Sequence, residues 1–244
     1  MQHTRSLAYS RAVAREGAAE RTKRAARIAR LLARAYPDAK IALRFDGPYQ
    51  LLVATILSAQ CTDERVNQVT RGLFRHLPSP AALAAARPAE VEALVRSTGF
   101  YRQKARAIQE ASRDLVERFG GDVPGSLDEL VTLRGVARKT ANVVLGNAFG
   151  VPGLAVDTHV RRVSQRLGLS REEDPVKIER DLAALLPPRE WTAYTTRVIH
   201  HGRVCCTARS PRCDACPLRP ECPWPARAGA RPAARGAVAR SRAR

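Results

Sequence analysis

The sequence has few lysines, few acidic residues and no long apolar run. Only five of its 42 basic residues are lysines: Lys23, Lys40, Lys104, Lys139 and Lys177. No apolar run approaches the roughly 18 residues that a membrane-spanning helix needs, so we expect no transmembrane segment. The N-terminal residues also lack the apolar core of a secretory signal. These absences argue against a membrane-spanning protein and against a secretory signal, and a mitochondrial-type presequence is the alternative for the Arg-rich N-terminus.

The scarcity of acids leaves a net charge of +19. Arginine and lysine that neutralise phosphates release condensed counterions, which supplies most non-specific affinity for nucleic acid. A preference for arginine codons would explain the few lysines, but it would not explain the surplus over 23 acids. The charge therefore favours a nucleic-acid partner, and a membrane surface or an acidic protein is the alternative.

Apolar residues recur at helical spacing along most of the chain, and no segment alternates with the period of a β-strand. Helices are predicted at 22–36, 48–60, 63–74, 88–98, 101–118, 126–132, 137–148, 157–168, 175–186 and 188–201. Pro48 and Pro88 suit first helical turns, and Asp63 is expected to cap the third helix. The predicted fold class is all-α.

Five of the six cysteines lie between residues 205 and 222, which points to a metal site rather than to disulfides. The pattern C-x6-C-x2-C-x5-C consists of Cys206, Cys213, Cys216 and Cys222. A structural zinc site usually has two short knuckles, and only one is present, so the spacing favours an iron–sulfur cluster over zinc. Cys205 is expected to be a spare thiol, and Cys61 a small core residue.

The segment between the first two of these cysteines, TARSPR, contains Arg209 and Arg212. A metal centre would tether this loop on both sides and present the two guanidinium groups to a phosphate. The alternative is a pair of solvated side chains.

Residues 126–148 read as a short helix, a tight turn at 134–137 and a second helix. The unpaired N–H groups at the start of a helix form an anion site, and Gly135 allows close approach of the backbone. This pattern predicts a helix-hairpin-helix that grips DNA phosphates. A helical hairpin that binds no ligand is the alternative.

Lys139 lies in the first turn of that second helix. The helix dipole and neighbouring Arg138 both disfavour its charge, so we expect a lowered pKa. A neutral amine can attack an electrophilic sugar carbon, whereas arginine cannot lose its proton. Asp157 is expected to cap the helix at 157–168 and can also stabilise a cationic sugar. The alternative roles are a surface lysine and a simple cap.

The motifs ILSAQCTD, GVARKTANVV, VDTH, HGR and the four-cysteine pattern occur together and in this order. In this combination the chain resembles endonuclease III, a bifunctional DNA glycosylase and abasic-site lyase of the helix-hairpin-helix superfamily. The resemblance covers about residues 25–222. It implies two helical lobes with a DNA-binding cleft between them: a six-helix barrel over 41–151, and an iron–sulfur lobe formed by 22–40 and 152–222. A basic extension, 1–21, and an Arg-rich tail, 223–244, lie outside the family pattern, and we expect the tail to be disordered.

The resemblance also implies the chemistry. Lys139 matches the Schiff-base lysine, Asp157 matches the catalytic aspartate, and the four cysteines match the ligands of a 4Fe–4S cluster. The implied substrates are double-stranded DNA with oxidised or reduced pyrimidines, such as thymine glycol, or with abasic sites that β-elimination cleaves on the 3′ side. Such an enzyme is expected to be a monomer in the bacterial cytoplasm, associated with the nucleoid.

Further positions match the DNA contacts of the family. Gln60 matches the residue that fills the gap left by a flipped nucleotide, Phe100 matches the intercalating wedge, and His159 is expected near the backbone at the lesion. The hairpin residues Gly135, Ala137 and Arg138 complete the predicted DNA-binding set, together with Arg209 and Arg212.

Two hairpin residues depart from the family pattern L-P-G-V-G-R-K-T. Arg134 replaces the proline and Ala137 replaces the second glycine. If position 137 needs a positive φ, alanine costs about 1 kcal/mol there. Arg134 is expected to offset this through a direct phosphate contact.

Two other functions are compatible with parts of this pattern. Adenine-removing mismatch glycosylases typically lack the lysine and have a further C-terminal domain, for which the tail is too short. A lesion-binding paralogue without catalytic activity remains the alternative.

Overall fold

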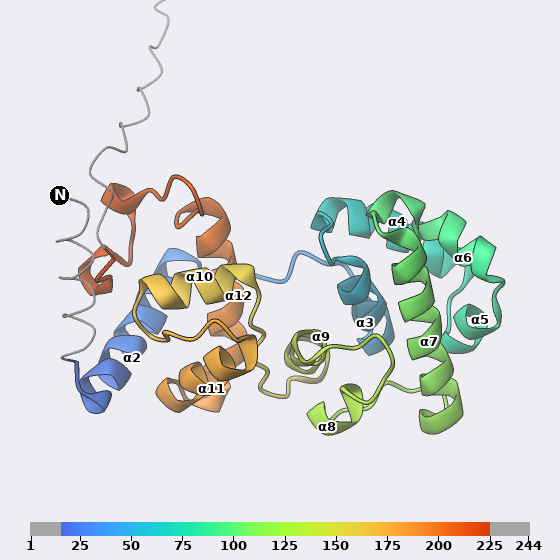
Figure 1. Cartoon of the computed structure of the whole chain (residues 1–244), viewed down its shortest axis with the longest axis horizontal. Coiled ribbons are helices and arrows are strands. Elements are labelled where there is room, and N and C mark those ends of the chain that lie inside the picture. The colour runs from blue at the N-terminus through green and yellow to red at the C-terminus, as the bar shows by residue number, and fades with distance from the viewer. Residues whose placement is uncertain (1–15, 225–244) are drawn as a thin grey trace, which may run out of the picture.

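The computed structural model describes residues 16–224, and every regular element in this range is a helix (Figure 1). The all-α prediction is therefore confirmed. Residues 225–244 of the predicted tail and residues 1–15 of the N-terminal extension lie outside the described residues. No described helix is long and apolar enough to cross a membrane. The α-helices are α2 (Ala18–Ala35), α3 (Pro48–Leu57), α4 (Asp63–His76), α5 (Pro80–Ala85), α6 (Pro88–Val95), α7 (Tyr101–Phe119), α8 (Leu127–Leu130), α9 (Arg138–Val144), α10 (Thr158–Arg166), α11 (Pro175–Leu185) and α12 (Trp191–Val204).

The first lobe contains α3 to α9, which surround one hydrophobic core (Figure 1). Its central helix is α3, in which every residue from 51 to 57 is buried. A helix that is apolar on all sides must lie inside a protein, and α4, α7 and α9 pack directly against it. Pro48 occupies the first turn of α3, as predicted.

The second lobe has its own core and combines the two ends of the described chain. Helix α2 packs against α11 and α12, and the 3-10 turn Arg219–Glu221 lies against α2. The buried guanidinium of Arg24 on α2 donates to the carbonyl oxygens of Leu167, at 2.6 Å, and Glu221, at 3.1 Å. The chain leaves this lobe after α2 and returns to it after α9 (Figure 1).

Several predicted boundaries differ from the structure. Helix α5 was not predicted, although Ser79 caps it and Pro80 begins it. The expectation that Asp63 caps α4 is wrong, because the hydroxyl of Thr62 accepts the N–H of Arg65 and Asp63 is the first helical residue. Helix α3 ends at Leu57 instead of residue 60, and the turn that follows it brings Gln60 to a φ of 51°.

Candidate active site and DNA-binding cleft

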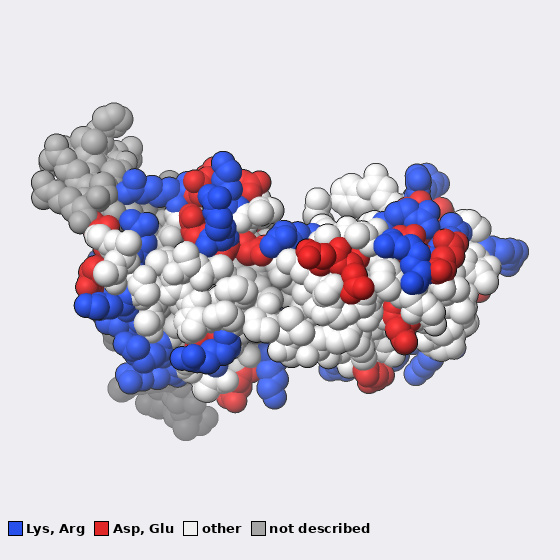
Figure 2. Space-filling view, turned by 90° about the horizontal axis from the view of Figure 1, so that it is seen from below, with Lys and Arg blue, Asp and Glu red and all other residues white. Residues whose placement is uncertain are grey.

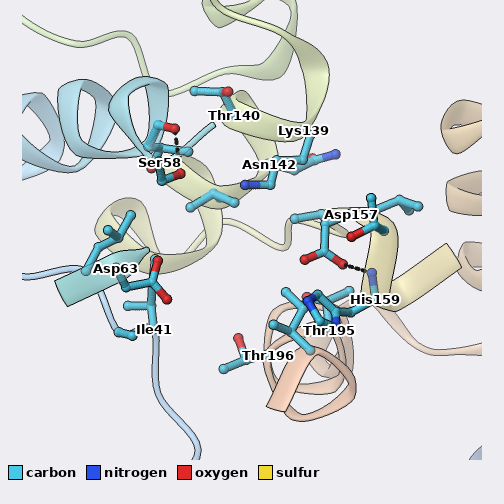
Figure 3. Close-up of a pocket in the computed structure, with 18 of the residues that line it drawn as sticks. Ile41, Ser58, Asp63, Lys139, Thr140, Asn142, Asp157, His159, Thr195 and Thr196 are labelled. Atoms are coloured by element: carbon cyan, nitrogen blue, oxygen red, sulfur yellow. Dashed lines mark hydrogen bonds between the residues drawn. The ribbon is translucent and has the colours of Figure 1, made fainter. Parts of the chain in front are cut away.

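A cavity of about 880 Å³ lies between the two lobes, and both contribute to its walls. Lys139 at the start of α9 and Asp157 at the start of α10 both line it (Figure 3). Gln60 and His159 line the same cavity. The fold therefore brings both predicted catalytic residues and two of the predicted DNA contacts to one cleft.

Lys139 is partly buried in this cleft. Burial lowers the pKa of its amine, while the carboxylates of Asp157 and Asp63 oppose that change and Arg203 adds to it. The direction agrees with the sequence analysis, but the cause differs. The Arg138 guanidinium points away to Glu179 on α11, with Nη2 2.8 Å from Oε1 and Nε 2.9 Å from Oε2.

Asp157 is the N-cap of α10, as predicted. Its Oδ1 accepts the N–H groups of His159 and Val160, both at 2.8 Å. The carboxylate itself faces the cleft (Figure 3). Capping therefore fixes the orientation of the side chain and leaves the second oxygen available to a substrate.

His159 has a neighbour that no sequence motif indicates, Arg162. Burial lowers the pKa of His159, and Nη2 of Arg162 lies 3.1 Å from its Nδ1. The same Arg162 nitrogen donates to the carbonyl oxygens of Gly202, at 2.9 Å, and Cys206, at 3.1 Å. Gly202 permits this approach, because a Cβ there would lie 3.0 Å from the His159 ring. The HGR motif includes Gly202, but it does not indicate that Arg162 lies beside it.

Two ion pairs connect the lobes beside the cleft. Arg203 on α12 donates to Asp63 on α4 at 2.8 Å, and Arg138 binds Glu179. Asn142 also donates to Glu179, at 3.1 Å. The partner residues Asp63 and Glu179 were not predicted as site residues, because their role depends on how the lobes meet. Arg138, which was predicted to contact DNA, is thus engaged within the protein.

Gln60 and Phe100 are the only non-glycine residues at positive φ within 16–224, with values of 51° and 47°. Such a conformation costs of order 1–3 kcal/mol and persists only where the surroundings impose it. Phe100 is also 62% exposed, so it does not serve the core. Two strained, exposed residues at the positions predicted to enter the duplex are consistent with that role.

The hairpin between α8 and α9 has the predicted shape, and its two unusual residues are accommodated. Gly135 has a φ of 79°, and a Cβ there would lie 2.9 Å from the Cβ of Ala107. Ala137 has a φ of −81°, so alanine incurs no left-handed strain. The Arg134 guanidinium does not point to a free phosphate site, because Nη2 pairs with Asp114 on α7 at 2.7 Å.

The cysteine-rich segment surrounds a second, small cavity. All four predicted ligands, together with Cys205, His201 and Arg166, line it. Burial and the neighbouring thiolates raise the pKa of Cys213 and bring that of Cys222 to about 11. Thiols that oppose one another's ionisation need a cation to hold them as thiolates, so this donor set fits a cysteine-ligated metal centre.

The free thiol Cys205 also belongs to the wall of this cavity. Donor atoms of His201, Cys205 and Cys216 lie within 4.8 Å of one another, a set that differs from the predicted four. Burial and the neighbouring thiolates raise the pKa of Cys205 to about 12, and its Sγ lies 3.7 Å from the Arg212 carbonyl. The thiol predicted to be spare is thus a neighbour of the metal site.

The loop TARSPR is held from within the lobe. Arg166 donates to the carbonyl oxygens of Thr207, at 2.8 Å, and Ala208, at 2.9 Å. Arg209 and Arg212 are both exposed. Basic side chains are distributed over both lobes on the face in Figure 2.

Comparisons with known proteins agree with this geometry. Residues 53–188 match the model of the HhH-GPD superfamily base excision DNA repair protein, and residues 206–224 match the iron–sulfur binding domain of endonuclease III. Endonuclease III of Synechocystis is 53% identical over 84% of this chain and 94% of its own length. Endonuclease III of Escherichia coli is 38% identical, over 77% of this chain and 89% of its own.

Solved structures of endonuclease III and of a further DNA glycosylase are also similar to this chain. A trapped endonuclease III–DNA covalent intermediate matches with a TM-score of 0.79 and 44% identity, over 82% of this chain and 95% of that one. A thermostable thymine-DNA glycosylase, with 21% identity and a TM-score of 0.75, shares the fold. This chain belongs to the endonuclease III family of helix-hairpin-helix base excision repair enzymes and has the iron–sulfur domain of that family.

Proposed function

We propose that this glycosylase removes oxidised or reduced pyrimidines, such as thymine glycol, from double-stranded DNA and then cleaves the abasic site. The observation that carries the proposal is the shared cleft: a lysine whose pKa is lowered by burial lies beside a carboxylate fixed by helix capping. The match to a trapped covalent complex of endonuclease III with DNA supports a covalent route.

The proposed reaction begins with a damaged nucleotide flipped into the cleft. The neutral Nζ of Lys139 attacks the anomeric carbon as the bond to the base breaks, and Asp157 stabilises the positive charge that develops on the sugar. The ring opens to a Schiff base between Nζ and that carbon. Loss of a proton from the adjacent carbon expels the 3′ phosphate by β-elimination, and water releases the lysine.

The proposed DNA contacts divide between the lobes. Gln60 and Phe100 enter the duplex from the first lobe. The N–H groups at the start of α9 bind a phosphate near Gly135 and Ala137. His159, Arg209 and Arg212 contact the backbone from the second lobe. Arg138 contributes charge near the hairpin while it remains bound to Glu179.

Cys206, Cys213, Cys216 and Cys222 are the proposed ligands of the 4Fe–4S cluster. When bound, the cluster cross-links the segment on both sides of TARSPR and so fixes the loop with Arg209 and Arg212. No step of the proposed reaction passes through it. Because one chain supplies both walls of the cleft, we propose a monomer that acts on nucleoid DNA in the bacterial cytoplasm.

Borohydride trapping tests this proposal. The protein is incubated with duplexes that contain an abasic site or thymine glycol, the mixture is reduced, and covalent adducts are resolved by gel electrophoresis. Wild type should form an adduct on both, and Lys139→Gln should form none. Lys177→Gln, at an exposed lysine on α11, is the matched control and should behave as wild type. Binding without any wild-type adduct would identify a lesion-binding protein instead.

A further inference from the structure

Lys104 is a buried cation in an unfavourable place. It lies in the first turn of α7 and is 5% exposed. Burial lowers the pKa of its amine, and the helix N-terminus also disfavours a positive charge. Its described polar partner is a backbone carbonyl rather than a carboxylate. Burying a charge without a carboxylate partner lowers the stability of the fold, so a functional role is expected for Lys104.

The contacts of Lys104 converge on the turn that presents Phe100. Nζ donates to the carbonyl oxygen of Thr98 at 2.7 Å, and the backbone N–H donates to that of Phe100 at 3.1 Å. Thr98 is itself buried and donates through Oγ1 to Val95 at 2.8 Å. These bonds enclose Gly99, at a φ of 69°, and Phe100. Lys104 thus restrains both sides of the strained, exposed wedge position.

The turn that Lys104 restrains packs against the helix that follows the second strained residue, Gln60. The 3-10 turn Arg96–Thr98 packs against α4, which begins just after Gln60 and Cys61. Lys104 does not line the cleft, so it acts through the backbone rather than on the substrate.

We propose that Lys104 is a positioning residue that holds the Phe100 turn ready for insertion into the duplex. The proposal rests on the wedge role assigned to Phe100 above. Glycine at 99 gives the turn wide conformational freedom, and the bond from Nζ to Thr98 removes that freedom before DNA binds. Without the bond, insertion has to order the turn at the moment of binding, which lowers affinity for the opened duplex.

The test compares Lys104→Met with wild type on two substrates. Methionine fills a similar volume, and removal of the buried charge offsets the loss of the hydrogen bond to Thr98, so thermal stability should stay near the wild-type value. Duplex DNA with a tetrahydrofuran abasic-site analogue and 2-aminopurine opposite it reports insertion by fluorescence. We expect Lys104→Met to lose most of the wild-type fluorescence change and, on the scale of one charge-assisted hydrogen bond, roughly tenfold in single-turnover lyase rate on duplex abasic sites.

The remaining arms separate positioning from other effects. Phe100→Ala should reproduce the loss, and the double variant should add nothing to it. The lyase rate on single-stranded abasic DNA, which needs no wedge, should stay at the wild-type value in every variant. Arg102→Met removes an exposed charge from the same turn of α7 and should behave as wild type on both substrates.

Three results would overturn the inference while wild-type activity stands: a normal fluorescence change in Lys104→Met, an equal rate loss on single-stranded DNA, or the same loss in Arg102→Met. If wild type forms no borohydride adduct on either substrate, the proposed function is wrong. The inference about Lys104 depends on that function and would then be wrong as well. The wild-type adduct therefore distinguishes the two failures.

Discussion

The Asp114 carboxylate is expected to hold the hairpin between α8 and α9 in place. Its side chain is 7% exposed and binds Arg134 three times: the backbone N–H donates at 2.7 Å, Nε at 2.9 Å and Nη2 at 2.7 Å. Arg134 replaces the proline that would otherwise stiffen this turn. Asp114→Asn keeps the size of the side chain and one carbonyl oxygen, but it removes the charge.

The expected loss follows from these contacts. A hydrogen bond to a charged group contributes about 1.5–3 kcal/mol. Because the guanidinium side of the pair is half exposed, we expect Asp114→Asn to lower the free energy of unfolding by about 2 kcal/mol. For a chain of this size each kcal/mol shifts Tm by roughly 2–4 °C, so Tm should fall by about 4–8 °C.

The stability difference between wild type and Asp114→Asn should depend on pH in a defined direction. Burial raises the pKa of Asp114, but the side-chain and backbone hydrogen bonds from Arg134 outweigh it and bring the pKa below its ordinary value. A carboxyl with a depressed pKa in the folded state contributes stability above its unfolded pKa and loses it as pH falls through the folded value. The difference between wild type and variant should be constant from pH 7 to pH 5 and shrink below about pH 4.

Thermal unfolding followed by circular dichroism measures the effect. Glu117→Gln, at an exposed acid on the same helix, is the matched control with the same change in charge. If the two variants have the same Tm, the Asp114–Arg134 pair does not hold the turn. Duplex affinity, measured by fluorescence anisotropy, should fall only in the Asp114 variant.

Four further results are expected. Asp63→Asn should shift the pH profile of single-turnover lyase activity to lower pH, because the Asp63 carboxylate raises the pKa of Lys139; a shift to higher pH would contradict this. Cys222→Ser should lose the yellow-brown colour and the iron, which should be measured as about four atoms per chain in wild type. A colourless wild-type protein that contains zinc would show that the site holds zinc and not an iron–sulfur cluster. Ala137→Gly should leave duplex affinity unchanged, since Ala137 has a negative φ; tighter binding in a salt titration would show that its methyl group obstructs a phosphate. Arg209→Ala and Arg212→Ala should each reduce the salt slope of duplex binding by about 1, and an unchanged slope would mean that these side chains stay solvated.

The sequence predicted those features that depend on local order. The helical pattern, Pro48 at the start of α3 and the Asp157 cap are set by neighbours in the chain, and the structure has all three. The pairing of Asp114 with Arg134 was not predicted, because it depends on how α7 packs against the hairpin. That packing also explains why a basic residue can replace proline there.

The candidate site shows the same difference between features set by neighbours in the chain and features set by packing. The motifs singled out Lys139 and Asp157, and the lobes bring them together in one cleft. The motifs did not show that burial, rather than Arg138, lowers the pKa of the lysine, since Arg138 turns to a helix that lies far along the chain. The backbone strain at Gln60 and Phe100 was also invisible, because neither residue type indicates a positive φ.

The second lobe contains both ends of the described chain, and this affects the order in which the protein can mature. During synthesis α2 leaves the ribosome early, yet its partners α11 and α12 follow only after the whole first lobe. We expect the first lobe to fold as a contiguous unit while the apolar face of α2 is still uncovered. Since Arg24 on α2 binds the carbonyl oxygen of Glu221, beside Cys222, we expect this lobe to close only when α2 and the cysteine-rich segment come together.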